Sequence, residues 1–319
     1  MPVKIVFMGT PDFAVPTLAT LLASDYNLVA VVTQPDRPSG RGKKLSPPPV
    51  KLVAEQAGLE VLQPRTLRSP EVLAALEALS PDVIIVAAFG QILRQPVLDL
   101  PPYGCLNVHA SLLPRWRGAA PVNAAIRAGD TETGVTIMQM EAGLDTGPIL
   151  SKQALPITSQ HTAGSLTAEL AHLGARLLTE TLPLWFNKEI TPEPQNEARA
   201  TYAPRLSKEE GLIDWSQSAV DLERLVRAFD PWPGTFTLGP RGPIKVLALK
   251  LAGSSVAESG PPGTVFTQQR RVYVSTGAGV VELISVQPAG KKAMSAEALL
   301  NGQPELVGYQ LEFLTTGSR

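Results

Sequence analysis

The amino-acid sequence predicts an α/β domain with a mainly parallel sheet, then a linker, then a small domain built of β-strands. Three observations predict this order. Continuous apolar runs alternate with helical patterns over residues 4–186, the stretch 191–205 is polar and aperiodic, and short β-like runs separated by Gly and Pro follow Gly234. Alternating strands and helices are typical of parallel sheets. Short, regularly spaced strands are typical of small barrels or curled sheets.

The first domain is expected to hold six strands covered by helices on both faces. Continuous apolar runs such as VIIVAAF, which begins at Val83, suit a sheet of this kind. The expected strands are Lys4–Gly9, Leu28–Gln34, Val61–Leu62, Val83–Phe89, Leu106–Ala110 and Val135–Met140. The expected helices are Phe13–Ala23, Val50–Ala57, Glu71–Leu79, Pro121–Ala128 and Thr162–Phe186. Together they predict a Rossmann-like domain.

The last third of the chain is expected to form about five strands behind one short helix, Ala219–Phe229. The expected strands are Thr235–Leu238, Ile244–Leu249, Gly263–Phe266, Val272–Ser275 and Val280–Val286. We therefore expect a first domain over 1–189, a linker over 190–206 and a β-barrel domain over 207–319. Trp215 and Trp232 are expected to be packing residues, because large aromatic side chains dominate cores.

Composition predicts an ordinary globular protein of the cytoplasm. The hydrophobic fraction is 44% and the charged fraction 18%, enough to build buried cores. The one cysteine, Cys105, has apolar neighbours and no partner for an intramolecular disulfide, so it is expected to be a buried thiol in a reducing compartment. Neither a secretory signal nor an apolar stretch of about 18 residues is found, so no membrane partner is expected.

The net charge of −1 hides one local asymmetry. Between Gln34 and Lys51, five basic residues stand against the single acid Asp36, which gives +4. An excess of this kind on a nearly neutral protein indicates a local anionic partner.

One strand end in the first domain carries side chains suited to acyl transfer. Asn107 and His109 lie two apart in the expected strand, so they project from the same face near its carboxyl end, where open α/β sheets bind ligands. Asp145, in the loop GLDTG, can reach His109 if its strand is a neighbour. An amide can donate to an oxyanion, and a histidine can move a proton beside a carboxylate that orients it. This set needs no nucleophilic Ser or Cys if the substrate supplies the attacking group.

Each of these residues taken alone has a structural interpretation. Asn107 and His109 could be a hydrogen-bonded pair at a strand end, and Asp145 could be a turn residue bonded to its own backbone. His161 and His172 lack the spacing of metal ligands, so no metal is expected. The segment MGTPDF after the first strand lacks the G-x-G-x-x-G spacing, which argues against a nicotinamide dinucleotide.

Longer motifs decide between these interpretations. The segment NVHASLLPRWRGAAP (107–121) continues the strand, and further matching segments occur in order along the chain: MGTPDFAVP (8–16), TQPDRPSGRGKKLSPPPVK (33–51), GVTIMQMEAGLDTG (134–147), RLSKEEGLIDW (205–215), RAFDPWPG (227–234) and VQPAGKKAM (286–294). In these segments the chain resembles the methionyl-tRNA formyltransferases, within the wider family of 10-formyltetrahydrofolate-dependent formyltransferases and hydrolases.

The resemblance implies a role for each matching residue. It implies that Asn107, His109 and Asp145 are the catalytic set and that 10-formyltetrahydrofolate is the formyl donor. It implies that the segment of Ser111, Leu112, Leu113 and Pro114 helps to hold the folate. It also implies an OB-like second domain. From the residues alone, Asn107 is expected to stabilise the oxyanion, His109 to support proton transfer and Asp145 to orient His109.

The basic loop PDRPSGRGKKLSPPP has a structural interpretation as a solvated surface loop, but its glycines and cations would also let it track phosphates. In the family that the chain resembles, the matching loop enters the tRNA acceptor region. The resemblance therefore implies that Arg41, Lys43 and Lys44 contact initiator Met-tRNA, for translation initiation. The protein is expected to be a monomer.

Two other functions stay open at this point. A formyltransferase or hydrolase of the same family could use a small amine or water as acceptor, and would then turn over without tRNA. A non-catalytic tRNA-binding protein on the same scaffold is the third possibility. The intact Asn107, His109 and Asp145 set argues against it.

Overall fold

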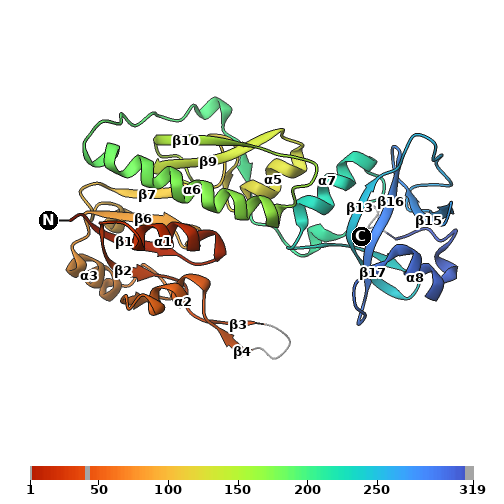
Figure 1. Ribbon diagram of the computed structural model, residues 1–319, viewed down its shortest axis with the longest axis horizontal. Helices are drawn as coiled ribbons and strands as arrows, with labels where there is room; N and C mark the ends of the chain where they lie inside the picture. Colours follow the sequence, from red (N-terminus) through yellow and green to blue (C-terminus); the bar gives the residue numbers. More distant parts are fainter. Residues whose placement is uncertain (1, 40–43, 313–319) are drawn as a thin grey trace. The chain divides into compact units, whose positions relative to one another are not determined.

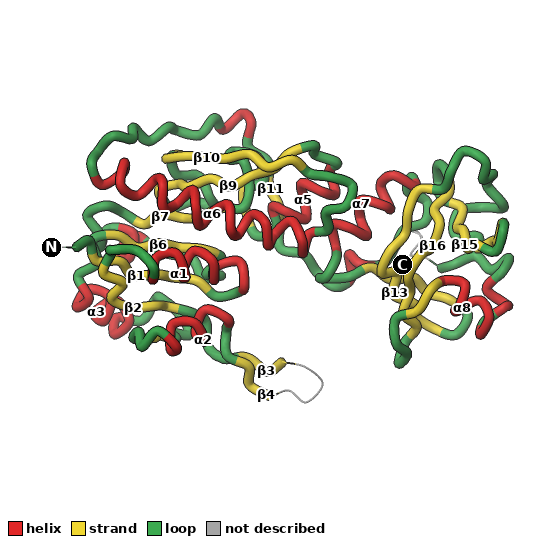
Figure 2. Tube along the Cα trace, in the orientation of Figure 1, coloured by secondary structure: helices red, strands yellow, loops and turns green. Residues whose placement is uncertain are grey.

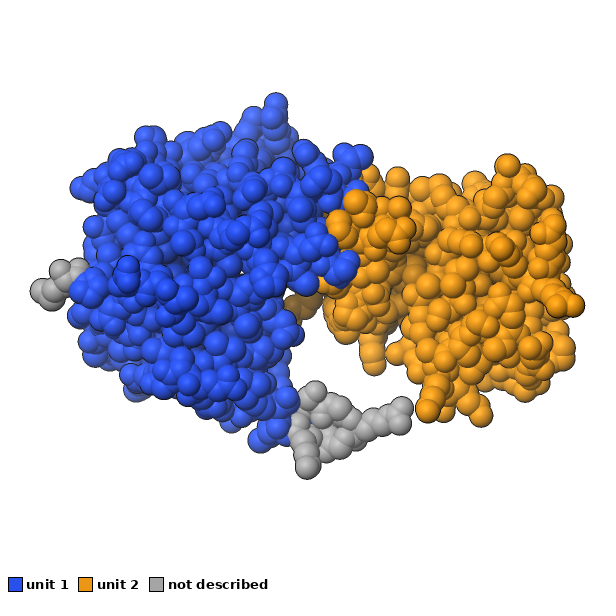
Figure 3. Space-filling view, in the orientation of Figure 1, with its two compact units in different colours: residues 1–121, 131–157, 165–203 blue, residues 122–130, 158–164, 204–319 orange. Residues whose placement is uncertain are grey.

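The computed structural model describes residues 2–39 and 44–312, and these divide into two compact units (Figure 3). The first unit comprises residues 1–121, 131–157 and 165–203, and the second comprises 122–130, 158–164 and 204–319. The second unit thus includes two short segments that precede residue 189. The domain limits expected from the sequence, 1–189, 190–206 and 207–319, stay a prediction.

The first unit is built on a seven-stranded sheet of order β10-β9-β7-β6-β1-β2-β5 (Figure 1). Its strands are β1 (Lys4–Gly9), β2 (Asn27–Val32), β5 (Val61–Leu62), β6 (Val83–Ala87), β7 (Cys105–His109), β9 (Glu132–Gln139) and β10 (Ile149–Pro156). The first five pair in parallel, while β9 pairs antiparallel with both β7 and β10. The expected α/β fold with a mainly parallel sheet is therefore confirmed.

Helices and short elements connect these strands. The helices are α1 (Val15–Leu22), α2 (Pro49–Gln56), α3 (Pro70–Leu79), α4 (Gln95–Leu98), α5 (Pro121–Ala128) and α6 (Ala163–Phe186), with 3-10 turns η1 (Asp12–Ala14) and η2 (Glu197–Arg199). The two-stranded pieces are β3 (Arg37–Ser39) with β4 (Lys44–Ser46), and β8 (Arg117–Gly118) with β11 (Tyr202–Ala203). Figure 2 shows β3 and β4 side by side as an antiparallel hairpin.

Helix α6 packs closely on the strand that carries the expected catalytic residues. A Cβ atom at Gly174 would stand 2.6 Å from Val108 Cγ1 on β7 and 3.3 Å from Val135 Cγ1 on β9. Only a glycine allows the helix backbone to come this near without a shift. Because alternate residues of a strand face opposite ways, Val108 faces α6 while Asn107 and His109 face the other side.

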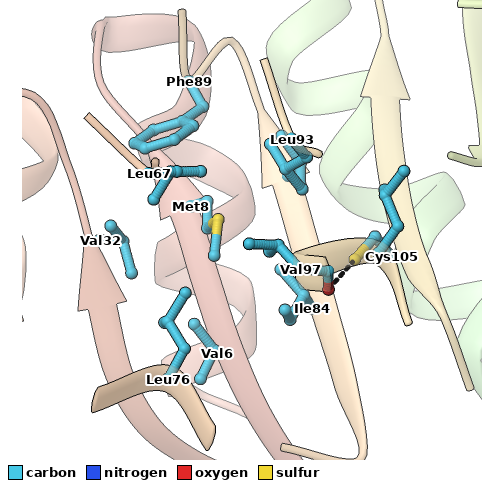
Figure 4. Close-up of a cluster of buried hydrophobic side chains, with 12 residues drawn as sticks. Val6, Met8, Val32, Leu67, Leu76, Ile84, Phe89, Leu93, Val97 and Cys105 are labelled. Carbon is cyan, nitrogen blue, oxygen red and sulfur yellow. Dashed lines mark hydrogen bonds between the residues drawn. The ribbon is translucent and has the colours of Figure 1, made fainter. Parts of the chain in front are cut away.

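A core of buried apolar side chains holds the centre of the sheet (Figure 4). Val6, Met8 and Ile84 from the central strands meet Leu76 of α3 and Val97 of α4, with Phe89 and Leu93 from the segment between β6 and α4. Each fully buried side chain of this size contributes about 1.5–3 kcal/mol. Cys105 belongs to this core and is 1% exposed, so the expected buried thiol is confirmed.

The second unit contains an antiparallel sheet of order β12-β13-β16-β15-β14, with β17 paired to β16. Its elements are η3 (Glu209–Gly211), α7 (Ala219–Phe229), β12 (Thr235–Gly239), β13 (Gly242–Leu251), β14 (Val265–Gln268), β15 (Arg271–Ser275), β16 (Val280–Pro288), β17 (Met294–Ser295), α8 (Ala296–Gly302) and η4 (Pro304–Leu306). Trp215 is fully buried and donates from Nε1 to Thr237 Oγ1 at 2.9 Å, as a packing residue should. The same expectation was wrong for Trp232, which is 52% exposed.

Candidate active site

Strand β7 brings Asn107 and His109 to one face, and both side chains are nearly buried at 9% and 5% exposure. The strand lies between β6, to which it is parallel, and β9, to which it is antiparallel. Neighbours on both sides fix its backbone by ladder hydrogen bonds, so the two side chains project from a rigid support.

The loop after β9 brings Asp145 to these two residues. Because β9 is antiparallel to β7, it ends beside Leu106, and the loop must return for Asp145 to reach His109. Asp145 Oδ2 lies 3.7 Å from His109 Nδ1, and Asp145 Oδ1 accepts from Asn107 Nδ2 at 3.5 Å. The structure therefore brings together all three residues that the sequence suggested. Both distances are long, as catalytic hydrogen bonds often are before substrate binds.

The hydrogen-bond partner on the other side of the His109 ring, the carbonyl oxygen of Trp116, shows which ring nitrogen carries the hydrogen. His109 Nε2 lies 3.0 Å from the carbonyl oxygen of Trp116. A carbonyl oxygen can only accept, so Nε2 carries the hydrogen and donates. The other ring nitrogen, Nδ1, then faces the Asp145 carboxylate, and a proton at Nδ1 would lie between the two groups.

Asp145 adopts a backbone conformation that needs external support. Its φ is +53°, in the left-handed region that non-glycine residues seldom occupy and that costs on the order of 1–3 kcal/mol. The backbone N–H of Gly118 donates to Asp145 Oδ2 at 2.8 Å and so fixes the carboxylate. Gly118 has a φ of +112°, and a Cβ there would stand 2.7 Å from the Ala203 carbonyl oxygen. The donor to Asp145 therefore comes from a turn that requires glycine.

Two residues that sequence reasoning missed hold the same loop. Gln195 Nε2 donates to the carbonyl oxygens of Asp145 and Gly147 at 2.8 and 2.7 Å. The fully buried Arg117 donates to Gln195 Oε1 from Nε at 3.0 Å and from Nη2 at 2.9 Å. Gln195 lies in the polar stretch that the sequence marks as linker, where no periodicity signals a role. The only signal for Arg117 was its place in the RWRG segment.

Arg117 is also paired on its outer side. Its guanidinium donates to both carboxylate oxygens of Glu197, at 2.7 and 2.9 Å. The hydrogen bond from Arg117 lowers the pKa of Glu197 below its ordinary value, and the same contact raises the pKa of Arg117. Arg117 is therefore a fully buried charged group with donors that point to Gln195 and Glu197.

The segment expected to hold the folate follows β7 directly. Ser111 Oγ donates to the Arg115 carbonyl oxygen at 2.6 Å and is fully buried, and Leu113 packs with Met138 and Ile149. These two side chains are used inside the protein. Leu112 and Pro114 are half-buried and keep side-chain surface for a ligand. Folate contacts of Ser111, Leu112, Leu113 and Pro114 stay a prediction.

The basic loop expected to bind tRNA is described only at its base. Arg41 and Lys43 lie outside the described residues, and of Lys44 only the backbone is described, at the start of β4. Asp36 anchors the base of the loop, because Lys51 Nζ lies 3.0 Å from its Oδ1 and Gln63 Nε2 donates to it at 2.8 Å. The hydrogen bond from Gln63, then that from Lys51, lowers the pKa of Asp36.

A cleft of about 350 Å³ lies near the carboxyl ends of β2 and β6, lined by Gln34, Pro35, Arg37, Arg65, Gly90 and Gln91. Its guanidinium and amide groups suit carboxylate or phosphate oxygens.

Within residues 2–39 and 44–312, no group of three or more His, Cys, Asp or Glu side chains is placed to hold a metal ion. In the same part of the chain, no helix has the length and hydropathy to cross a bilayer.

Two family models together match most of the chain. The model described as formyl transferase matches residues 3–182, and the model of the formyl transferase C-terminal domain matches residues 205–304. The first alone covers more than half of the chain.

Three solved structures illustrate the likeness of the fold. HypX from Aquifex aeolicus in complex with tetrahydrofolic acid is 18% identical, with a TM-score of 0.64, over 96% of this chain and 48% of that chain. The sugar 3N-formyl transferase WlaRD, in the presence of dTDP and 5-N-formyl-THF, is 18% identical, with a TM-score of 0.66, over 92% of this chain and 100% of its own. The N-formyltransferase from Helicobacter canadensis, in complex with folinic acid and dTDP-3-aminofucose, is 18% identical, with a TM-score of 0.64, over 88% and 98%. This chain spans about half the length of the HypX chains that it matches. At these identities the likeness shows the fold.

Proposed function

This chain belongs to the formyl transferase family, and from that premise we propose that it transfers the formyl group of 10-formyltetrahydrofolate to the amino group of methionine charged on initiator tRNA. The product would be N-formylmethionyl-tRNA, for translation initiation. The observation that carries the reaction is the contact of Asp145 with both Asn107 and His109 on a rigid strand end.

The donor is supported by the chemistry of the site and by the ligands of similar proteins. HypX was solved with tetrahydrofolic acid and WlaRD with 5-N-formyl-THF. The segment from Ser111 to Pro114 follows the candidate catalytic strand directly, so a folate held there would present its formyl group to Asn107 and His109. The amine of an acceptor would then need to reach the same two residues.

Asn107 suits the stabilisation of the oxyanion. Its Nδ2 carries two N–H groups, and one of them points to Asp145 Oδ1 at 3.5 Å, which leaves the other for the reacting oxygen. When the amine lone pair forms the new C–N bond, the formyl oxygen takes the negative charge. A preorganised donor at this position stabilises that charge, and loss of one such donor costs about 10²–10³ in kcat.

His109 and Asp145 suit the proton transfers. The attacking amine must lose a proton after the C–N bond forms, and N10 of the folate must gain one as its bond to the formyl carbon breaks. His109 Nδ1 faces Asp145, so this pair can accept the first proton and return the second. The products are the N-formyl amine and tetrahydrofolate, and no group on the enzyme is changed.

The acceptor is supported by the charge pattern of the chain. The basic segment that leads into β4 carries Arg41, Lys43 and Lys44, and such cations bind nucleic-acid phosphates. A second candidate is the same chemistry on a small amine, because one structure with a similar fold is a sugar 3N-formyl transferase and another is an N-formyltransferase in complex with dTDP-3-aminofucose. Use of water as acceptor, as in a hydrolase, belongs with this second candidate.

Substitution of the three residues tests the reaction. We expect His109→Ala, Asp145→Ala and Asn107→Ala each to lower kcat for folate-dependent formyl transfer by about 10²-fold or more, because each removes a group that acts only in the transition state. The KM for 10-formyltetrahydrofolate should stay near the wild-type value. Near-normal kcat in the His109 and Asp145 variants would exclude this mechanism.

A further inference from the structure

We propose that Gln195 is a positioning residue for Asp145 and that the buried Arg117 fixes Gln195 in turn. This inference rests on the proposed function, in which the Asp145 carboxylate serves the reacting groups. The observation behind it is a continuous series of hydrogen bonds from Arg117, through the Gln195 amide, to the backbone of the Asp145 loop.

The Asp145 loop is not held by its own contacts alone. Within the loop, the Gly143 N–H donates to the Glu141 carbonyl oxygen at 2.8 Å, and Thr146 Oγ1 donates to the Glu141 carboxylate at 2.8 Å. Both of these bonds return to Glu141, at the start of the loop. Neither fixes the direction of the Asp145 side chain, whose backbone has a φ of +53°. A strained residue of this kind persists only where its surroundings determine it.

Gln195 supplies two of the missing contacts. Both N–H bonds of its amide are used, one on the carbonyl oxygen of Asp145 and one on that of Gly147. The two acceptors lie on either side of Thr146, so one side chain spans the turn. The chain just before Gln195 is also held in place, because the backbones of Glu193 and Ile149, the first residue of β10, exchange hydrogen bonds of 2.8 Å in both directions.

Arg117 determines which way the Gln195 amide points. The amide oxygen accepts two N–H groups from the guanidinium, so the amide nitrogen must face the loop. Arg117 is fully buried, so its guanidinium has little freedom to turn away from Gln195. The next residue, Gly118, donates to the Asp145 carboxylate itself. The Arg117–Gly118 strand therefore supports Asp145 at its side chain directly and at its backbone through Gln195.

Displacement of the loop would act on the chemistry without touching a ligand. The carboxylate lies 3.7 Å from His109 Nδ1, so a further shift would separate the two groups. A misplacement of about 1 Å can cost about 10²-fold in rate. The loss would fall on kcat, because Gln195 touches Asp145 through its main chain and, in the proposed reaction, neither the donor nor the acceptor.

The Gln195→Glu variant separates positioning from packing. Glutamate has the same shape and still accepts from Arg117, but it has no N–H to give to the loop carbonyls. We expect kcat to fall on the order of 10-fold or more, with both KM values within about 2-fold of wild type. Glu197→Gln is the matched control, since it leaves the Arg117–Gln195 contact intact and should keep kcat within about 2-fold. Gln195→Met, which also lacks the donors, is the second variant if Gln195→Glu fails to fold.

A double-mutant cycle tests the route of the effect. If Gln195 acts through Asp145, Gln195→Glu should cause no further loss of kcat in an Asp145→Ala background. A loss as large as that seen in the wild-type background would overturn the inference, because Gln195 would then act elsewhere.

Amide hydrogen exchange gives a readout that does not need activity. The Gly118 N–H donates to Asp145 Oδ2, so its protection reports the position of the carboxylate. We expect Gln195→Glu to lower the protection of Gly118 and Glu197→Gln to leave it unchanged. Unchanged protection in Gln195→Glu overturns the inference whether or not the protein transfers formyl groups. Lowered protection in a protein that transfers no formyl group to any acceptor refutes the proposed function and supports the positioning.

Discussion

Removal of the buried Arg117 should destabilise the first unit by about 3–5 kcal/mol in the variant Arg117→Ala. Three contributions give this magnitude. Gln195 Oε1 loses its two donors, which costs about 1–2 kcal/mol for a partly buried acceptor left without these partners. The lost packing of a fully buried long side chain adds about 2 kcal/mol. The Glu197 side chain is 68% exposed, so its loss of an ion pair adds only about 0–1 kcal/mol.

The single cysteine of the chain provides the assay. Cys105 is buried in the core of the first unit, so a thiol reagent can modify it only when that unit opens. The rate of modification as a function of urea concentration then gives the free energy of opening. Arg117→Met should cost less than Arg117→Ala, because it keeps most of the volume and loses only the hydrogen bonds.

The control variant is Glu197→Gln, for which we expect a loss below about 1 kcal/mol. A loss in Glu197→Gln as large as that in Arg117→Ala would show that the ion pair, and not the buried hydrogen bonds to Gln195, is the main contribution. A loss below about 1 kcal/mol in Arg117→Ala itself would refute the reasoning from burial.

Two further predictions concern the basic loop and the buried thiol. The double variant Arg41→Ala with Lys43→Ala should raise the KM for tRNA and flatten its salt dependence, with little change in the KM for folate. The control variant Lys152→Ala with Lys188→Ala, on exposed residues outside the loop, should change neither KM. Equal losses with a small amine as acceptor would contradict a phosphate-binding role for the loop. Burial, and then the charge of Asp99, raises the pKa of the Cys105 thiol to about 12 from an ordinary value of 9.0. Below pH 9 the thiol is protonated in both states, and between pH 9 and 12 only the unfolded chain loses the proton, so stability should fall over that range. Urea unfolding should show a smaller fall in Cys105→Ala, and equal slopes in the two proteins would argue against a buried thiol that resists ionisation.

Many elements of both units could be predicted because their signals are local. Helices α5 and α7 begin and end at the residues expected from their apolar periodicity, and strands β1 and β5 also match. The shared face of Asn107 and His109 followed from the alternation of side chains in a strand. Asp145 lies beside His109, as expected, and also contacts Asn107, which was not expected.

The direction of the strands at one edge of the sheet could not be predicted from hydropathy. Strand β10 was not expected, because four of its eight residues are exposed, and β9 is antiparallel to β7. An apolar run predicts a strand but does not indicate whether the strand runs parallel or antiparallel to its neighbours, because that depends on the connections around it. The return of the 140–147 loop toward His109 follows from that direction.

The support of Asp145 was missed for a different reason. Gln195 lies 50 residues from Asp145 in the chain, and its contacts are single hydrogen bonds rather than an apolar face. The segment around it has no period, because its residues pair one by one with β10, Arg117 and the Asp145 loop. A polar aperiodic stretch therefore has the composition of a linker even where its side chains support a loop of the candidate active site.

The transfer of labelled formyl from 10-formyltetrahydrofolate, compared for initiator Met-tRNA, elongator Met-tRNA and no acceptor, tests the central claim most directly. We predict labelled N-formylmethionine on the initiator tRNA, little on the elongator and slow folate turnover without tRNA. Equal turnover without tRNA, or efficient transfer to a small amine with none to Met-tRNA, would contradict the proposed acceptor and move the function to the second candidate.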